Sequence, residues 1–154
     1  MFSDSPEHVW VDASGQLHRH ITYRDGRWLA AEVILDRSLG YGTYRFDLAS
    51  PTGGLDPNVV LGLFTWSDDP AYNHREIDIE FRQVGRCRRS TEPQYVVQPY
   101  NGAGNLFSFA QPGEASTAHQ FTWASNRVSF LSTTAAGRTI AARKYSGRSV
   151  PRAG

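Results

Sequence analysis

Cysteine is almost absent from this chain of 154 residues, since Cys87 is the only one. A single cysteine excludes an internal disulfide framework and a metal cluster held by cysteines. Cys87 lies among arginines, whose positive charge can activate a thiol. Because nothing else in the sequence indicates a nucleophile there, we interpret Cys87 as an ordinary loop residue.

Excess charge and long apolar runs are also lacking. The formal net charge is only +1, which gives no indication of nucleic-acid binding. No apolar run approaches the length of a membrane span, and the first residues lack the basic and apolar regions of a signal peptide. No glycine loop is suited to phosphate, and His18, His20 and His74 do not form a zinc site. We therefore expect no cofactor, no metal, and neither a nucleic-acid nor a membrane partner.

Strand signals dominate what is present, whereas no stretch shows the sustained periodicity and caps of a helix. Aromatic residues make up 12% and charged residues 20% of the chain, as is typical of a globular protein, and the length fits one domain over residues 1–154. Strand candidates between turn residues are 10–12, 17–23, 28–35, 43–48, 59–66, 95–99, 119–124, 127–133 and 139–144. Many short strands with regular turns predict an all-β fold, an antiparallel sandwich or barrel.

Two kinds of local pattern add detail to this prediction. The continuous apolar run 59–66 predicts a central buried strand. Ser125-Asn126 and Ala136-Gly137 predict tight turns between neighbouring antiparallel strands.

Residues 76–81 alternate three carboxylates with three apolar side chains. On a strand, Glu76, Asp78 and Glu80 share one face and the apolar residues share the other. Like charges in a row on a sheet repel one another, so stability alone rarely favours them. Residues four apart on a strand have Cα atoms about 13 Å apart. Two glutamates that lean toward each other bring their carboxyl groups to about 5 Å, the separation that retaining glycosidases use.

Two other interpretations of this run stay open at this point. An acidic stripe on a strand is commonly a solvated outer face. A calcium site is the other option, although the usual calcium loop has a turn glycine among its ligands and this run has none. The residues around the run decide between them.

The surrounding segments resemble glycoside hydrolase family 16, which includes bacterial lichenases, laminarinases and plant xyloglucan-modifying enzymes. The matching stretches, in chain order, are GYGTYRF at 40–46, GLFTW at 62–66, HREIDIEF at 74–81, YNGAGN at 100–105 and HQFTW at 119–123. Their order and spacing carry the resemblance. It implies a concanavalin-like β-jelly roll with a cleft across its concave face, and retaining hydrolysis of a β-linked glucan or galactan.

The resemblance also implies a role for each carboxylate. By position in the motif, Glu76 matches the nucleophile, Glu80 the general acid/base and Asp78 the aspartate between them. The chemistry agrees, because Glu76 must be ionised to attack the anomeric carbon and Glu80 must begin protonated to assist the leaving oxygen. Negative charge nearby favours the protonated form of Glu80, and Asp78 is suited to tuning its neighbours by charge and hydrogen bonding.

Further candidates for substrate binding flank the expected cleft. The aromatic candidates for sugar stacking, each with core packing as the alternative, are Trp66, Tyr72, Tyr100 and Trp123. The polar candidates for hydrogen bonds to sugar hydroxyls, with a structural role as the alternative for the histidine, are Asn73, His74 and Gln98. An arginine-rich stretch at 85–89 is compatible with an anionic polysaccharide, and a solvated loop is its alternative.

The sequence departs from the family pattern at its C-terminal end. Similar family members continue past residue 151 into another cleft-lining strand and a final strand. We therefore expect the 1–154 domain to be incomplete at the C-terminus, as a fragment, a truncated gene or a fold completed by a partner.

The sequence thus predicts an endo-acting, retaining β-glycanase whose partner is a polysaccharide or oligosaccharide. The alternatives are a non-catalytic carbohydrate-binding jelly roll and a transglycosylase that uses the same carboxylates. We expect a monomer. The family implies an extracellular location, although no signal peptide is visible in the chain.

Overall fold

The structure is a computed structural model that describes residues 1–72, 75–83, 91–111 and 116–146. The chain divides into two compact units, Met1–Ser38 and Leu39–Gly154. Cys87 and the arginine-rich stretch at 85–89 lie outside the described residues.

The first unit consists of two small antiparallel hairpins. Strands β1 (Val9–Val11) and β2 (Leu17–Arg19) form one, and β3 (Thr22–Arg24) and β4 (Arg27–Leu29) form the other. Asp25 and Gly26 close the second hairpin with φ angles of 51° and 75°, the left-handed backbone that a two-residue turn requires. Inside this unit, buried His8 joins the hairpins through a hydrogen bond of 2.7 Å with Thr22.

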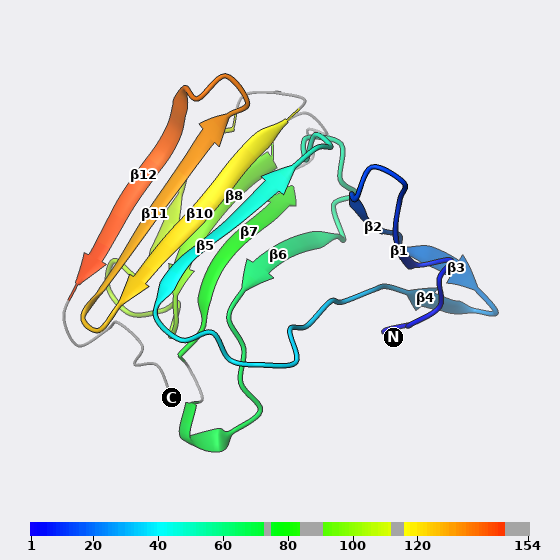
Figure 1. Cartoon of the computed structure of the whole chain (residues 1–154), viewed down its shortest axis with the longest axis horizontal. Helices are drawn as coiled ribbons and strands as arrows, with labels where there is room; N and C mark the ends of the chain where they lie inside the picture. Colours follow the sequence, from blue (N-terminus) through cyan, green and yellow to red (C-terminus); the bar gives the residue numbers. More distant parts are fainter. Residues whose placement is uncertain (73–74, 84–90, 112–115, 147–154) are drawn as a thin grey trace. The chain divides into compact units, whose positions relative to one another are not determined.

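The second unit contains two four-stranded antiparallel sheets. The first, here called the β10 sheet, has the order β12-β11-β10-β5, and the second, the β7 sheet, has the order β6-β7-β8-β9. Figure 1 shows the two sheets stacked as layers. The elements, in chain order, are β5 (Gly42–Leu48), β6 (Val60–Phe64), the 3-10 turn η1 (Pro70–Tyr72), β7 (Ile77–Gln83), β8 (Thr91–Val97), β9 (Leu106–Ser108), β10 (Thr117–Ala124), β11 (Arg127–Thr134) and β12 (Thr139–Ser146).

The core of this unit lies between the two sheets. Ile77, Ile79 and Phe81 of β7 are fully buried and belong to a cluster that includes Phe121 of β10 and Phe130 of β11. The apolar half of the alternating run therefore faces the opposite sheet. Burial of these side chains supplies the main force that holds β7 in place.

A buried polar network also joins the two sheets. The Tyr95 hydroxyl on β8 donates a hydrogen bond of 2.6 Å to Ser132 on β11. His119 hydrogen-bonds to Ser132 through Nδ1 and to Thr117 through Nε2, both at 2.7 Å. Burial lowers the pKa of His119 to about 4, so the imidazole is neutral in the folded protein at neutral pH.

The predicted all-β antiparallel sandwich is confirmed, while the jelly-roll connectivity stays a prediction. The tight turns are also confirmed. Ser125-Asn126 connects β10 to β11 by a two-residue loop, and Gly137, with φ of 80°, lies in the turn before β12. The acidic strand forms as predicted, with the bounds Ile77–Gln83.

Three strand predictions were wrong in detail. The run 59–66 is not a central buried strand: β6 lies at the edge of its sheet among the described strands, and Val60 is 57% exposed. The run 17–23 is divided between β2 and β3, and 28–35 contributes strand structure only at its start, in β4. An apolar or β-branched run indicates a strand but does not identify the neighbours that would bury it.

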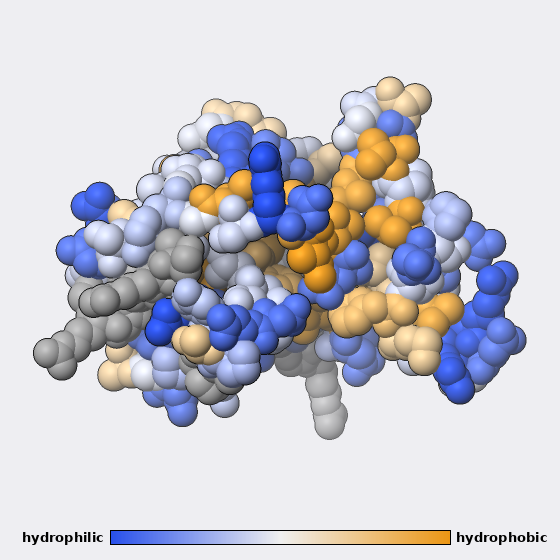
Figure 2. Space-filling view, turned by 60° about the horizontal axis from the view of Figure 1, so that its bottom comes forward, coloured by the Kyte–Doolittle hydropathy of each residue, from blue (hydrophilic) through white to orange (hydrophobic). Residues whose placement is uncertain are grey.

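Apolar side chains also reach the surface in patches among charged ones, as Figure 2 shows. In the second unit, large exposed hydrophobic side chains outside the core include Val60, Phe64, Trp66, Tyr100 and Leu106. No membrane-spanning helix is found in the described ranges.

Candidate active site

Strand β7 and the residue before it direct three acidic side chains away from the core. Because Ile77 and Ile79 point into the sandwich, the alternation of the strand directs Asp78 and Glu80 to the outer face of the β7 sheet. Glu76 directly precedes the strand, and its carbonyl accepts a 3.0 Å hydrogen bond from the Gln98 N–H. This bond continues the β7–β8 ladder by one residue, so Glu76 extends the same row.

Strand β6 forms an aromatic border on one side of this row. Gly62 lies across from Glu80, and Phe64 lies across from Asp78. The Phe64 ring folds over Gly62, since a Cβ atom at Gly62 would lie only 3.1 Å from it. The missing side chain at Gly62 therefore allows the ring to lie beside the carboxylate row.

Trp66 continues this border toward Glu76. The Thr65 N–H donates a 3.1 Å hydrogen bond to the Ile77 carbonyl, which extends the β6–β7 pairing by one step and brings Trp66 beside Glu76. The indole is 63% exposed and donates a 2.9 Å hydrogen bond to Asp68. Its orientation is thus fixed while its face stays open to solvent.

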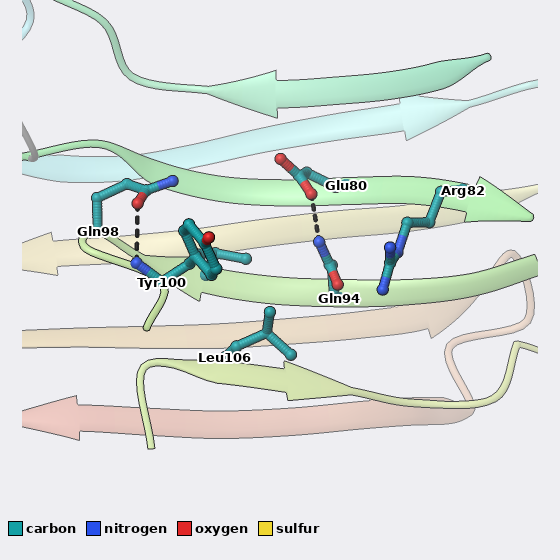
Figure 3. Close-up of a pocket in the computed structure, with 7 residues that line it drawn as sticks. Glu80, Arg82, Gln94, Gln98, Tyr100 and Leu106 are labelled. Carbon is teal, nitrogen blue, oxygen red and sulfur yellow. Dashed lines mark hydrogen bonds between the residues drawn. The ribbon is translucent and has the colours of Figure 1, made fainter. Parts of the chain in front are cut away.

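Strands β8 and β9 form a polar pocket on the other side of the row. Its volume is about 280 Å³, and its lining residues are Glu80, Arg82, Gln94, Val96, Gln98, Tyr100 and Leu106. Figure 3 shows the side chains of Glu80 and Gln94 meeting across β7 and β8, with the Arg82 guanidinium beside Gln94.

The loop after β8 supplies the end of this pocket. The Tyr100 N–H donates a 2.9 Å hydrogen bond to the Gln98 side-chain oxygen, which leaves the amide nitrogen of Gln98 pointing toward β7 (Figure 3). Asn105 holds the loop closed through a 2.9 Å hydrogen bond to the Pro99 carbonyl. Tyr100 is 63% exposed and presents its ring at the pocket.

Asp78 is the electrostatic centre of the row. It is 1% exposed, and neither carboxyl oxygen has a well-aligned hydrogen-bond partner among the described residues. Burial, reinforced by the charge of Glu76, raises the pKa of Asp78 from its ordinary value of 3.8 to about 9. Asp78 therefore carries a proton at neutral pH, which is incompatible with a solvated acidic stripe.

Glu76 and Asp78 form a coupled pair in which Asp78 holds the proton. Burial raises the pKa of Glu76, and the charge of Glu80 adds to the increase. The polar contact with Asp78 acts in the opposite direction and favours the ionised Glu76. The neutral Asp78 thus separates two glutamates without adding a third negative charge.

Glu80 is held by a single strong contact within the described part of the chain. The Gln94 amide nitrogen donates a hydrogen bond to the Glu80 carboxyl group. Gln94 itself is 6% exposed, so its amide is fixed by packing and orients the glutamate over the pocket.

The structure brings most of the predicted site residues together, with one correction. Trp66, Gln98 and Tyr100 lie on the face with the three carboxylates. Trp123 does not, because it lies on β10 and packs against the interior cluster; its ring contacts Tyr41 at 5.2 Å.

The remaining candidates lie near η1. Tyr72 is half-buried there, and its ring lies 4.8 Å below the Arg75 guanidinium. Asn73 and His74 lie outside the described residues.

Three residues of this face were missed at the sequence level. Arg82 continues the alternation two residues past Glu80, and Gln94 on β8 precedes Gln98 by four residues, so the period of two could have identified both. Phe64 belongs to GLFTW, and the apolar run around it predicts a buried strand and not a residue of an exposed face. Among the described residues, no group of three His, Cys, Asp or Glu side chains is arranged to hold a metal ion.

Comparison with known proteins adds no relative to this description. No protein-family model, no curated protein and no solved structure matches the chain.

Proposed function

We propose that this chain is a retaining glycoside hydrolase that cleaves a β-linked glucan or galactan within the polymer. The observation that carries the proposal is the row of Glu76, Asp78 and Glu80 on the outer face of the β7 sheet, in which burial raises the pKa of the central carboxyl group to about 9. A row of this kind costs stability, which a purely structural face would avoid.

The proposed reaction has two steps. In the first, a Glu76 oxygen bonds to the anomeric carbon, the glycosidic C–O bond breaks, and the Glu80 proton moves to the leaving oxygen. In the second, Glu80 takes a proton from water, the water oxygen bonds to the anomeric carbon, and the Glu76 ester bond breaks. Protonated Asp78 favours the ionised Glu76 that the first step requires.

The borders of the row support a sugar ligand. Phe64 and Trp66 offer apolar surface on one side, and the amide of Gln98 and the ring of Tyr100 lie on the other. Carbohydrate sites combine flat apolar surface with a few fixed hydrogen-bonding groups. The indole of Trp66, held by Asp68, meets the first requirement, and the Gln98 amide, whose oxygen accepts a hydrogen bond from the Tyr100 N–H, meets the second.

Replacing either glutamate tests the proposal. We expect Glu76→Gln and Glu80→Gln each to lower the release of reducing ends by about 10³-fold or more, because each removes a group that acts in the transition state. The substrates are mixed-linkage glucan, laminarin, xyloglucan, agarose and carrageenan. Glu32→Gln, which changes an exposed glutamate of the first unit, serves as the matched control and should keep full activity.

An aryl glycoside with a good leaving group distinguishes the nucleophile, Glu76, from the general acid/base, Glu80. Such a substrate needs no acid, so Glu80→Ala should form the glycosyl-enzyme and azide should accelerate turnover to give a β-glycosyl azide. Glu76→Ala with azide should give the α-anomer. Equal activity of wild type and both glutamine variants would refute the assignment. Retention of a glycan with no product from any polymer would favour a binding protein, and transfer to added oligosaccharides would favour a transglycosylase.

A further inference from the structure

Arg82 introduces a positive charge into the pocket beside Glu80. It lies two residues after Glu80 on β7, so the two side chains share a face and their Cα atoms are about 7 Å apart. Among the described residues that line the pocket, it is the one with a cationic side chain. In Figure 3 the guanidinium reaches across β8 and lies beside Gln94.

The acidic groups near Arg82 do not neutralise it by contact. Glu80 is engaged by Gln94, and Glu92, which lies across from Arg82 on β8, is exposed. The ion pairs among the described residues do not include Arg82. Its guanidinium offers several N–H donors to a ligand.

We propose that Arg82 forms a subsite for an anionic substituent, a carboxylate or a sulfate ester, on the sugar unit held against Glu80. The inference rests on the proposed function and names the substrate class for it. A guanidinium binds carboxylate and sulfate groups through paired N–H donors, whereas neutral hydroxyls gain much less from it. An anionic unit beside Glu76 and Glu80 also requires a nearby cation, and Arg82 supplies it at the Glu80 end of the row.

The test compares matched polymers that differ only in charge. One pair is a sulfated β-galactan and its desulfated form, and the other is a β-glucan and the same glucan oxidised to uronate at C6. Both kcat/KM and binding by calorimetry are measured at low salt. We expect wild type to prefer the charged member of one pair by about tenfold, and the preferred pair identifies sulfate or carboxylate as the ligand group. The preference should shrink at about 0.5 M NaCl.

Arg82→Gln should abolish this preference, so that the charged and the neutral polymer of a pair are cleaved with similar kcat/KM. The melting temperature should stay unchanged, as expected for an exposed side chain. Arg127→Gln removes the same charge from an exposed position on β11 and should keep the wild-type preference.

The possible outcomes distinguish failure of the subsite proposal from failure of the hydrolase proposal. If the polymers are cleaved but the charge preference survives in Arg82→Gln, the subsite proposal is wrong and the hydrolase proposal stands. The same holds if wild type cleaves the polymers with no charge preference. Charge-dependent binding that Arg82→Gln removes, with no cleavage of any polymer, supports the subsite and overturns the hydrolase. Absence of both binding and cleavage overturns both.

Discussion

At the scale of single residues, Asp78 lowers the stability of the fold while it serves the proposed chemistry. Its carboxyl group is buried without a full set of hydrogen-bond partners among the described residues, and its pKa is raised to about 9. An unfolded aspartate loses its proton near pH 4, whereas the folded Asp78 keeps it. Between these two pH values the folded state binds the extra proton, so the free energy of unfolding falls as the pH rises.

Asp78→Asn should therefore stabilise the protein at neutral and alkaline pH. The amide imitates the protonated carboxyl group and cannot ionise, so we expect a gain of about 1–3 kcal/mol at pH 8 that disappears near pH 4. Urea denaturation at pH 4.5, 6 and 8 measures the difference. Asp4→Asn, at an exposed position, is the control and should keep the wild-type pH dependence. The same pH dependence in Asp78→Asn and wild type would show that the carboxyl group ionises normally.

At the scale of elements, β7 is positioned by its inward side chains. Ile77, Ile79 and Phe81 are fully buried against the β10 sheet, and β6 and β8 pair with β7 on both sides. The outward carboxylates depend on this packing for their position. Strand β6 contributes less buried apolar surface to the core than β7 does, because it is an edge strand among the described residues and part of its apolar surface is exposed.

Truncation of Ile79 should reveal this difference between strands. We expect Ile79→Ala to lower the free energy of unfolding by about 2–5 kcal/mol and Ile79→Val by about 0.5–1.5 kcal/mol. Val60→Ala, at a position that is 57% exposed on β6, should cost less than about 1 kcal/mol. Thermal and urea denaturation measure all three variants. An equal loss for Ile79→Ala and Val60→Ala would contradict the described packing.

At the scale of the second unit, the buried polar network between the sheets sets the response to acid. The pKa of His119 is lowered to about 4 by burial, while an unfolded histidine titrates near pH 6.5. As the pH falls through this window, the unfolded chain binds a proton that the folded state does not, so stability is lost. Protonation would place a charge between the sheets, beside Ser132 and Thr117.

His119→Asn tests this response in the Asp78→Asn background, where the opposite trend from the Asp78 carboxyl group is absent. We expect the double variant to be less stable than Asp78→Asn by about 1–3 kcal/mol at pH 7, because hydrogen bonds are lost. Its stability should change less between pH 7 and pH 4.5. The measurement is urea denaturation across this range, and an equally steep decline with and without His119 would assign the acid response to other groups.

The sequence predicts the alternating face of β7 because a period of two determines side-chain direction without knowledge of the neighbours. The two tight turns are predicted for a similar reason, since turn residues act locally. The place of β6 at the sheet edge and the inward direction of Trp123 depend on sheet order, which the sequence does not contain. The proton on Asp78 could not be predicted either, since it results from burial of the carboxyl group in the folded sheet.

Strand β7 packs one face against the core and carries carboxylates on the other, and this limits which sequence changes residues 76–81 can accept. Its inward and outward positions alternate one by one, so a substitution at a single position leaves every other side chain on its own face. Insertion or deletion of one residue has a larger effect, because beyond that point the inward-facing and outward-facing side chains exchange faces. Carboxylates would then point into the hydrophobic core between the two sheets. The turn at Ala136-Gly137 carries no such constraint. We therefore expect length changes to be tolerated in the hairpin turns and excluded from 76–81, even in variants that preserve composition.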